Sequence, residues 1–120
     1  MQKLNTLEER IMQAIWELKL AFPKDIFNKI KSPAPYNTLL STIRKLEKQG
    51  FLSYKKYGKS HQYFPLVSKK DYSKYLFKNF FDHYLNGSRE NLVSFFMEEE
   101  KVDIKELESL LDKLKEQNGE

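Results

Sequence analysis

The sequence predicts a mainly α-helical protein that contains one small β-hairpin. Three observations lead to this fold class. Apolar residues recur at helical spacing in three segments before residue 50 and in three more after residue 68, and two strand-forming runs flank a glycine between them. The 120 residues suit one domain with an appendage. No apolar run exceeds three residues, which predicts no membrane insertion and no secretory signal.

The first helix is predicted over residues 4–18. Two capping boxes fit its start equally well, namely Asn5 with Glu8 or Thr6 with Glu9. Its apolar stripe follows a 3.6-residue period, which is typical of a helix packed on a core. The stripe consists of Leu7, Ile11, Ala14, Ile15 and Leu18.

Two more helices are predicted before residue 50. The second covers residues 23–31, where Pro23 is tolerated in the first turn. Two prolines then interrupt the chain, because each disfavours helix at the residue before it. The third helix covers residues 36–49, and Gly50 occupies the position where a left-handed cap ends many helices. Its core-facing side consists of Leu39, Ile43 and Leu46.

Residues 51–67 change character and predict a two-stranded hairpin. Aromatic residues, which favour strands, are frequent in both halves of this segment. The sequence Gly58-Lys59-Ser60 between the two halves is a turn signal.

The remainder of the chain is predicted to be helical. A helix over residues 69–85 is apolar around most of its circumference and ends at Asn86-Gly87. Ser88 caps a short helix, and Asp103 with Glu106 forms a capping box that opens the last one.

Three helices followed by a hairpin is the order of a winged helix-turn-helix, a DNA-binding fold. We therefore expect a winged-helix DNA-binding domain over residues 1–67 and a helical dimerisation region over residues 68–120. The charges agree with this division. Residues 1–67 hold 12 Lys and Arg against 5 Asp and Glu, a balance of +7, whereas residues 68–120 hold 9 against 12, a balance of −3. A basic domain suits a polyanionic partner.

The third helix and the hairpin carry the residues that we expect to contact double-stranded DNA. A helix fits the major groove, where its polar face can reach base edges, and hairpin lysines can reach phosphates. Ordinary roles remain open: a solvated helix face, helix-capping side chains, or lysines that protect an edge strand. The predicted DNA-binding residues are Asn37, Thr38, Leu40, Ser41, Arg44, Lys45, Lys48, Lys55, Lys56, Lys59 and His61.

The tail, residues 68–120, has more apolar residues than packing on one small domain requires. A second copy of the tail is the simplest cover for them. A dimer would also place two recognition helices on symmetric half-sites. The predicted dimerisation residues are Tyr72, Leu76, Phe80, Phe81, Tyr84, Leu92, Phe96, Ile104, Leu107, Leu111 and Leu114.

Four segments resemble the penicillinase and methicillin-resistance repressor family. They are LNTLEERIMQAIW, NTLLSTIRKLEKQGFL, YGKSHQYFPLVSKKDY and NLVSFFMEEE, in this order and over nearly the whole chain. The resemblance implies a dimeric transcriptional repressor that binds a dyad-symmetric operator.

The resemblance also implies regulation. In the family, a membrane-embedded sensor metallopeptidase triggers cleavage of the repressor in its dimerisation region, between an Asn and a Phe. The corresponding residues here are Phe95 and Phe96, so Phe95 stands in place of the Asn. A copper-responsive branch binds metal through C-terminal cysteines, which this chain lacks.

Other classes of function find no support in the sequence. It contains no glycine-rich phosphate loop, no nucleophile elbow and no His-x-x-x-His pair, so we expect neither an enzyme nor a cofactor. With two histidines and no cysteine, we expect no metal site either. We expect a cytoplasmic protein. Two alternatives stay open: a winged-helix module that binds other proteins without specific DNA binding, and a non-specific nucleic-acid binder.

Overall fold

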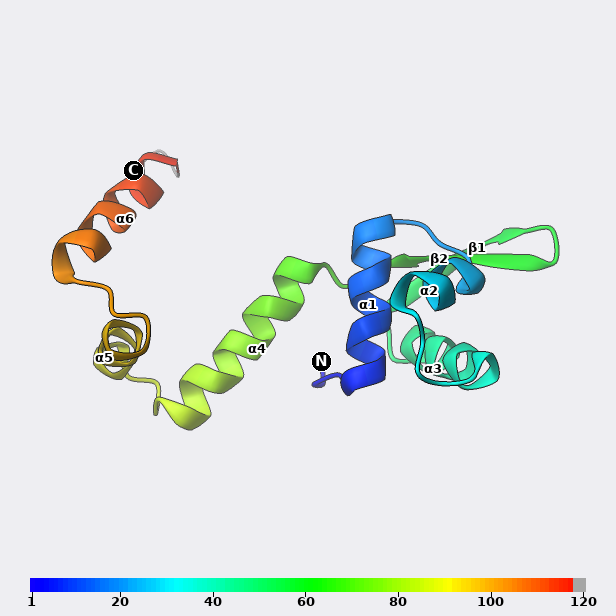
Figure 1. Cartoon of the computed structure of the whole chain (residues 1–120), viewed down its shortest axis with the longest axis horizontal. Helices are drawn as coiled ribbons and strands as arrows, with labels where there is room; N and C mark the ends of the chain where they lie inside the picture. Colours follow the sequence, from blue (N-terminus) through cyan, green and yellow to red (C-terminus); the bar gives the residue numbers. More distant parts are fainter. Residues whose placement is uncertain (118–120) are drawn as a thin grey trace. The chain divides into compact units, whose positions relative to one another are not determined.

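The computed structural model describes residues 1–117 and divides the chain into two compact units. The first unit, residues Met1–Leu76, contains three helices, a hairpin and the beginning of a fourth helix (Figure 1). The second unit starts at Phe77 and contains the rest of that helix and two more helices. The fold class predicted from the sequence, a mainly α-helical winged helix with one hairpin, is confirmed.

Helix α1 (Thr6–Leu18) is capped by the first of the two predicted boxes. The Asn5 side chain accepts a hydrogen bond from the Glu8 amide, and the Glu8 carboxylate accepts one from the Asn5 amide, each at 2.9 Å. Helices α2 (Pro23–Ile30) and α3 (Tyr36–Lys48) follow. Gly50 lies just beyond α3 with a φ of +85°, the left-handed conformation in which glycine is favoured.

Strands β1 (Leu52–Tyr57) and β2 (Ser60–Pro65) form an antiparallel hairpin. Tyr57 pairs with Ser60, so the loop has two residues, and Gly58 takes a φ of +63° at the first of them. A type II′ turn requires glycine at that position. The free edge of β2 pairs with Ala21, whose amide and carbonyl both bond to Tyr63. This bridge ties the hairpin to the segment between α1 and α2.

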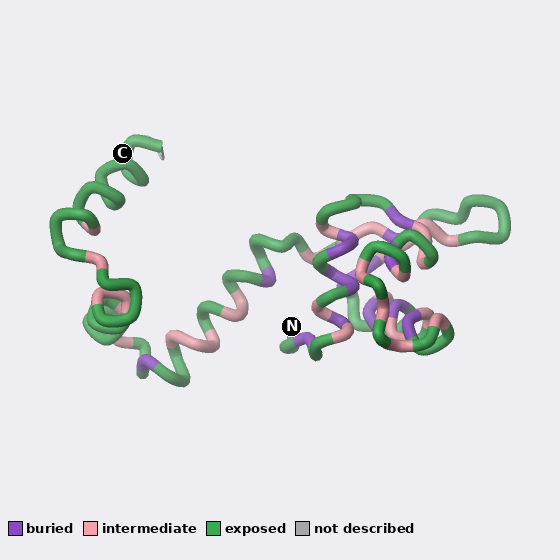
Figure 2. The backbone as a smooth tube through the Cα atoms, in the orientation of Figure 1, coloured by how far each residue is buried: buried purple, intermediate pink, exposed green. Residues whose placement is uncertain are grey.

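The first unit has a closed apolar core, shown as the purple segments of α1 and α3 in Figure 2. The aliphatic side chains of α1, α2 and α3 meet there and are completely buried. Phe51, just before the hairpin, and Leu52, its first residue, are buried in the same core. The fully enclosed aliphatic residues of the three helices are Ile11, Met12, Ile15, Ile26, Leu39, Ile43 and Leu46.

Helix α4 (Lys69–Tyr84) begins in the first unit. Tyr72 is 3% exposed, lies 6.0 Å from the ring of Trp16, and its hydroxyl accepts a hydrogen bond of 2.8 Å from the Leu4 amide. Trp16 in turn donates to the Val67 carbonyl. The first unit therefore extends to Leu76 and not only to residue 67, because the first turns of α4 complete its core.

The second unit contains the end of α4, α5 (Arg89–Glu99) and α6 (Ile104–Gln117). The Ser88 side chain caps α5, and the Asp103 carboxylate accepts a bond of 2.7 Å from the Glu106 amide at the start of α6. Over residues 77–117 only Leu85 is buried, so this unit has almost no core of its own. No helix in the described part of the chain is both long and apolar enough to cross a membrane.

Candidate nucleic-acid interface

The outward face of α3 is polar and basic. Successive helical residues are about 100° apart around the axis, so the residues opposite the buried Leu39, Ile43 and Leu46 form one stripe. The stripe consists of Asn37, Ser41, Arg44 and Lys48, and all four are exposed. An exposed stripe with amide, hydroxyl and cationic groups offers both donors and acceptors to a partner.

Two hydroxyl groups of α3 are bonded within the helix. Ser41 and Thr42 both donate to the Thr38 carbonyl, at 3.0 and 2.8 Å. Each hydroxyl keeps acceptor capacity toward an external donor, while its own proton is held by the helix. Thr38 lies about 100° from both Asn37 and Leu39, on the flank of the helix and not at the centre of the polar stripe. Its side chain is exposed.

The hairpin presents its lysines to solvent. Lys55, Lys56 and Lys59 are exposed at and near the turn. The half-buried His61 stacks on the Tyr54 ring, with 4.1 Å between the centroids and an angle of 7° between the planes. Lys56 pairs directly with His61 across the strands. The hairpin therefore carries three exposed cations beside a stacked pair of aromatic rings that includes the histidine.

A groove of about 530 Å³ lies where α2, α3 and the hairpin meet. Of the predicted residues, it brings together Leu40, Arg44, Lys59 and His61. Burial raises the pKa of the adjoining Tyr63 hydroxyl, Glu47 raises it further, and Arg44 lowers it. Arg44 thus lies close enough to the hairpin for its charge to act there.

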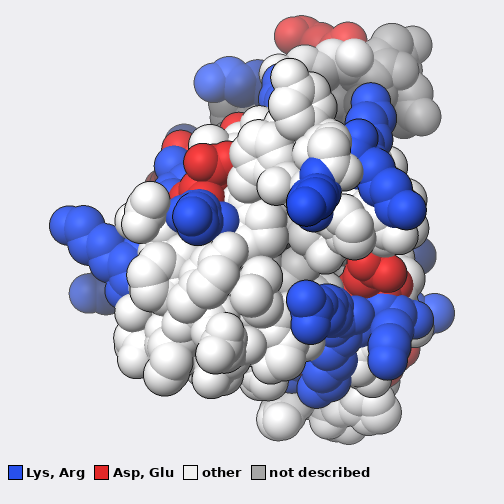
Figure 3. Space-filling view, turned by 90° about the vertical axis from the view of Figure 1, so that its right-hand side faces the viewer, with Lys and Arg blue, Asp and Glu red and all other residues white. Residues whose placement is uncertain are grey.

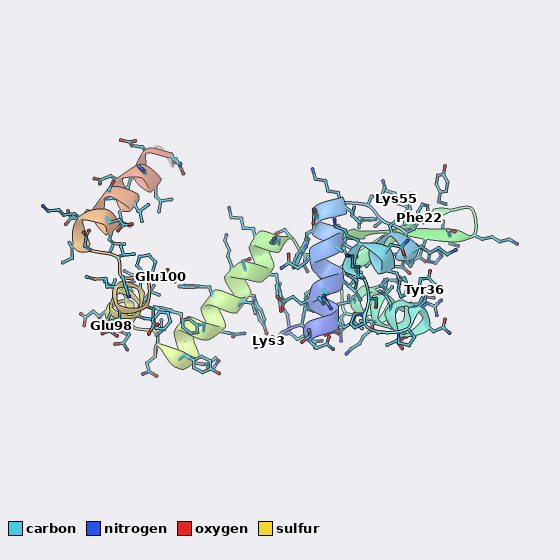
Figure 4. All side chains as sticks on the ribbon, in the orientation of Figure 1. Lys3, Phe22, Tyr36, Lys55, Glu98 and Glu100 are labelled. Atoms are coloured by element: carbon cyan, nitrogen blue, oxygen red, sulfur yellow. The ribbon has the colours of Figure 1, made fainter. Side chains whose placement is uncertain are left out.

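Seven residues that line this groove were not among the predicted site residues: Phe22, Pro23, Lys24, Asp25, Tyr36, Ser60 and Tyr63. Lys24 and Phe22 come from the start of α2, where Asp25 accepts a bond from the Phe22 amide at 3.0 Å. Tyr36 begins α3 and packs edge-on against Phe27 at 5.4 Å. Figure 4 labels Phe22, Tyr36 and Lys55 on the same side of α1. One signal in the sequence could have indicated that Lys24 lies at this groove, namely the short turn that connects its helix to the third helix.

Lys45 has a different environment from the other predicted lysines. Its ammonium lies 3.2 Å from the Glu8 carboxylate on α1, and that carboxylate is 3% exposed. We therefore separate Lys45 from the residues of the outward face, where we expected it. The reason is rotational, because Lys45 follows Arg44 by about 100° and points along the flank toward α1.

Positive charge dominates the face on which the hairpin, α2 and α3 lie. Figure 3 views the molecule from this side and shows several groups of Lys and Arg around an uncharged centre, with fewer acidic groups. Such a surface attracts a polyanion and raises its local concentration.

The predicted dimerisation residues fall into three environments. Tyr72 and Leu76 pack on the core of the first unit, so the prediction that Tyr72 contacts a partner is corrected by its burial there. Five others are half-buried within the second unit: Phe80, Phe81, Leu92, Phe96 and Leu107. The remaining four are exposed: Tyr84, Ile104, Leu111 and Leu114.

Residues 4–116 match the penicillinase repressor family. The chain is 31% identical over 116 residues to the methicillin resistance regulatory protein MecI of Mammaliicoccus sciuri, which covers 92% of this chain and 94% of that protein. It is 22% identical over 116 residues to the penicillinase repressor of Bacillus licheniformis, with coverages of 95% and 91%. The solved transcriptional regulator PA4135 is 17% identical, with a TM-score of 0.47, and covers 97% of this chain and 78% of its own. This chain belongs to the penicillinase repressor family.

Proposed function

We propose that this chain is a transcriptional repressor that binds a dyad-symmetric DNA operator as a homodimer. The observation that carries the proposal is the exposed polar stripe of α3 beside a hairpin with three exposed lysines. Membership of a family of transcriptional repressors supports the same conclusion.

In this proposal α3 enters the major groove of DNA. The groove admits one helix, and base edges there present a distinct pattern of donors and acceptors for each base pair. Asn37 and Arg44 have the side chains that pair with adenine and guanine edges. The hairpin lysines contact the neighbouring phosphates, which position the protein without reading sequence. In this proposal one of those phosphates lies in the groove of about 530 Å³ that Arg44 and Lys59 line.

The tail supplies the second half of the proposal. On α6, Ile104, Leu107, Leu111 and Leu114 recur at intervals of three and four residues and form one apolar stripe. Ile104, Leu111 and Leu114 are 60%, 49% and 53% exposed in the single chain. A stripe of this kind needs a cover, and an identical stripe on a second copy is self-complementary.

We extend the proposal to relief of repression by proteolysis in α5, on the basis of the family resemblance. The Phe95–Phe96 bond lies inside α5, where no residue is buried and where Phe95 is 45% exposed. A helix with so little burial opens locally at low cost in free energy, which gives a protease access to its backbone. The partner in this step is a membrane sensor metallopeptidase. Incubation with that peptidase followed by mass spectrometry locates the cleaved bond or shows an intact chain.

The DNA-binding proposal is tested with duplexes selected from a random pool by the purified protein. We expect one dyad-symmetric sequence to be enriched, and its affinity to fall steeply with salt as phosphate contacts release counterions. Arg44→Ala should cost about 1–3 kcal/mol and relax the preference at one position of each half-site. Arg10→Ala on the exposed face of α1 is the matched control and should leave that preference unchanged.

Equal, weak binding to every duplex would contradict the proposal and favour a non-specific nucleic-acid binder. Absence of any DNA retardation at low salt, together with a stable protein partner, would favour the interaction module.

A further inference from the structure

The buried carboxylate of Glu8 has one satisfied oxygen and one that faces a charge. Its Oε1 accepts the capping bond from the Asn5 amide at 2.9 Å. Its Oε2 has no hydrogen-bond partner of good geometry, yet lies 3.2 Å from the Lys45 ammonium. A carboxylate removed from water requires a compensating charge. In the described structure Lys45 supplies it from α3.

This ion pair joins the two helices whose relative position matters most for recognition. Both helices also contribute buried apolar side chains, such as Ile11, Ile15, Leu39 and Ile43, to the same core. Apolar contact is non-directional, so it holds the helices together without specifying one register strongly. A single buried charge with one partner is directional and is suited to selecting a register.

The geometry also removes Lys45 from the set of phosphate contacts. Its side chain is 55% exposed, but the ammonium lies at the carboxylate and on the flank of α3. Lys48, one helical turn from Arg44, lies on the outward stripe and has no ion-pair partner in the described structure. The two lysines therefore have different surroundings on the same helix.

We propose that Glu8 is a positioning residue for DNA recognition, which holds Lys45 and thereby fixes the register of α3 on α1. This inference rests on the proposed function, since it concerns how the recognition helix is presented. Lys45 acts as the link between the helices and not as a contact to the DNA backbone.

The test uses the full chain, the selected operator duplex and a random duplex, with affinities measured by fluorescence anisotropy at several salt concentrations. Glu8→Gln retains the capping box, because glutamine also fits that position, and removes only the charge. It makes the protein more positive, so a purely electrostatic effect would tighten binding. We expect the opposite, a roughly 2- to 30-fold loss of preference for the operator over the random duplex.

Lys45→Met should give a similar loss of preference, and the double variant should be no worse than Lys45→Met alone. The salt slope should stay unchanged in Lys45→Met, whereas the matched control Lys48→Met should lower it by about 0.9 as one phosphate contact disappears. Lys45→Arg keeps the charge and should therefore keep the wild-type preference for the operator over the random duplex. Two results together would overturn the proposal: a smaller salt slope in Lys45→Met, and a loss of operator preference in the double variant that equals the sum of the losses in the two single variants.

Hydrogen exchange of the α3 amides in the free protein separates this inference from the proposed function. We expect faster exchange in Glu8→Gln and wild-type exchange in Lys45→Arg. If the wild-type protein selects no duplex, the proposed function fails, and exchange alone decides whether Glu8 fixes α3. Unchanged exchange in Glu8→Gln would show that the carboxylate does not hold the helix.

Discussion

The two units of this chain differ in how far a single copy can satisfy its own apolar residues. The first unit, Met1–Leu76, encloses its aliphatic side chains and is joined by bonds between distant segments. The second unit contains the end of α4 and two further helices, yet among its described residues only Leu85 is buried. The first unit therefore encloses its own core, whereas the second leaves most of its apolar side chains exposed or half-buried.

The aromatic residues of the second unit are likewise left partly exposed to water. Phe77 stacks on Phe81 at 5.8 Å, and Phe80 contacts Phe95 edge-on at 5.6 Å. These pairs organise the surface of the tail without removing it from water, because Phe77 and Phe95 stay 49% and 45% exposed. An exposed ordered apolar surface is typical of an interface. The difference between the units thus separates a structure whose apolar core is complete in one chain from one whose apolar side chains stay largely uncovered in one chain.

The largest expected effect comes from a charge placed on the α6 stripe. Leu111→Asp should leave the single chain folded, because Leu111 is half exposed. It should prevent self-association, because a dimer formed through this stripe would bury an unpaired carboxylate. Operator affinity should then fall on the order of 10²- to 10⁴-fold, because the two copies of the chain no longer bind the operator together. Sedimentation velocity and anisotropy measure the two effects. Ser109→Asp, on the opposite side of α6, is the control, and an unchanged dimer in Leu111→Asp would place the interface elsewhere.

The next effect should distinguish the cores of the two units. Ile15→Ala removes a completely buried side chain and should lower the free energy of unfolding of the first unit by about 2–5 kcal/mol, measured in urea. Val93→Ala in α5, at a site 42% exposed, should leave that transition unchanged. If Val93→Ala destabilised the first unit as much, the two units would not be independent.

A smaller effect should appear where α4 joins the first unit. Tyr72→Phe leaves the Leu4 amide without its acceptor in a buried position and should cost about 1–3 kcal/mol. Urea denaturation followed by Trp16 fluorescence measures this loss, since the Trp16 ring lies 6.0 Å from Tyr72. Tyr84→Phe, at a ring 78% exposed, provides the control and should behave as wild type. Equal stability of Tyr72→Phe and wild type would show that the α4 contact contributes little.

The smallest effect concerns alkaline pH and is confined to the first unit. Burial raises the pKa of both Tyr63 and Tyr72 above the ordinary value of 10.0. Above that value the unfolded chain loses protons that the folded chain keeps, so the free energy of unfolding falls as pH rises. We expect a lower urea midpoint above about pH 10, with a weaker dependence in Tyr63→Phe/Tyr72→Phe. An identical dependence in that double variant would assign the effect to other groups.

Much of the fold follows from short-range patterns. The helix starts at Asn5, Ser88 and Asp103 are capped by the expected side chains, and the hairpin turns at Gly58. Each of these features depends on residues within about one helical turn or one tight turn, and steric and hydrogen-bonding preferences act at that range. The outward face of α3 was also predictable, because one apolar stripe determines the opposite one.

What the sequence by itself determined is the order of elements, their caps, their apolar faces and the basic character of the first half. Only the tertiary structure decided which faces meet. It paired Lys45 with Glu8, placed Tyr72 in the first unit through a bond to a residue 68 positions away, and added Phe22, Lys24 and Tyr36 to the groove. The physical reason is that a lysine or tyrosine on a helix flank has the same local pattern whether it faces solvent, a partner or another helix. Its role is set by long-range packing, which brings the compensating group to it.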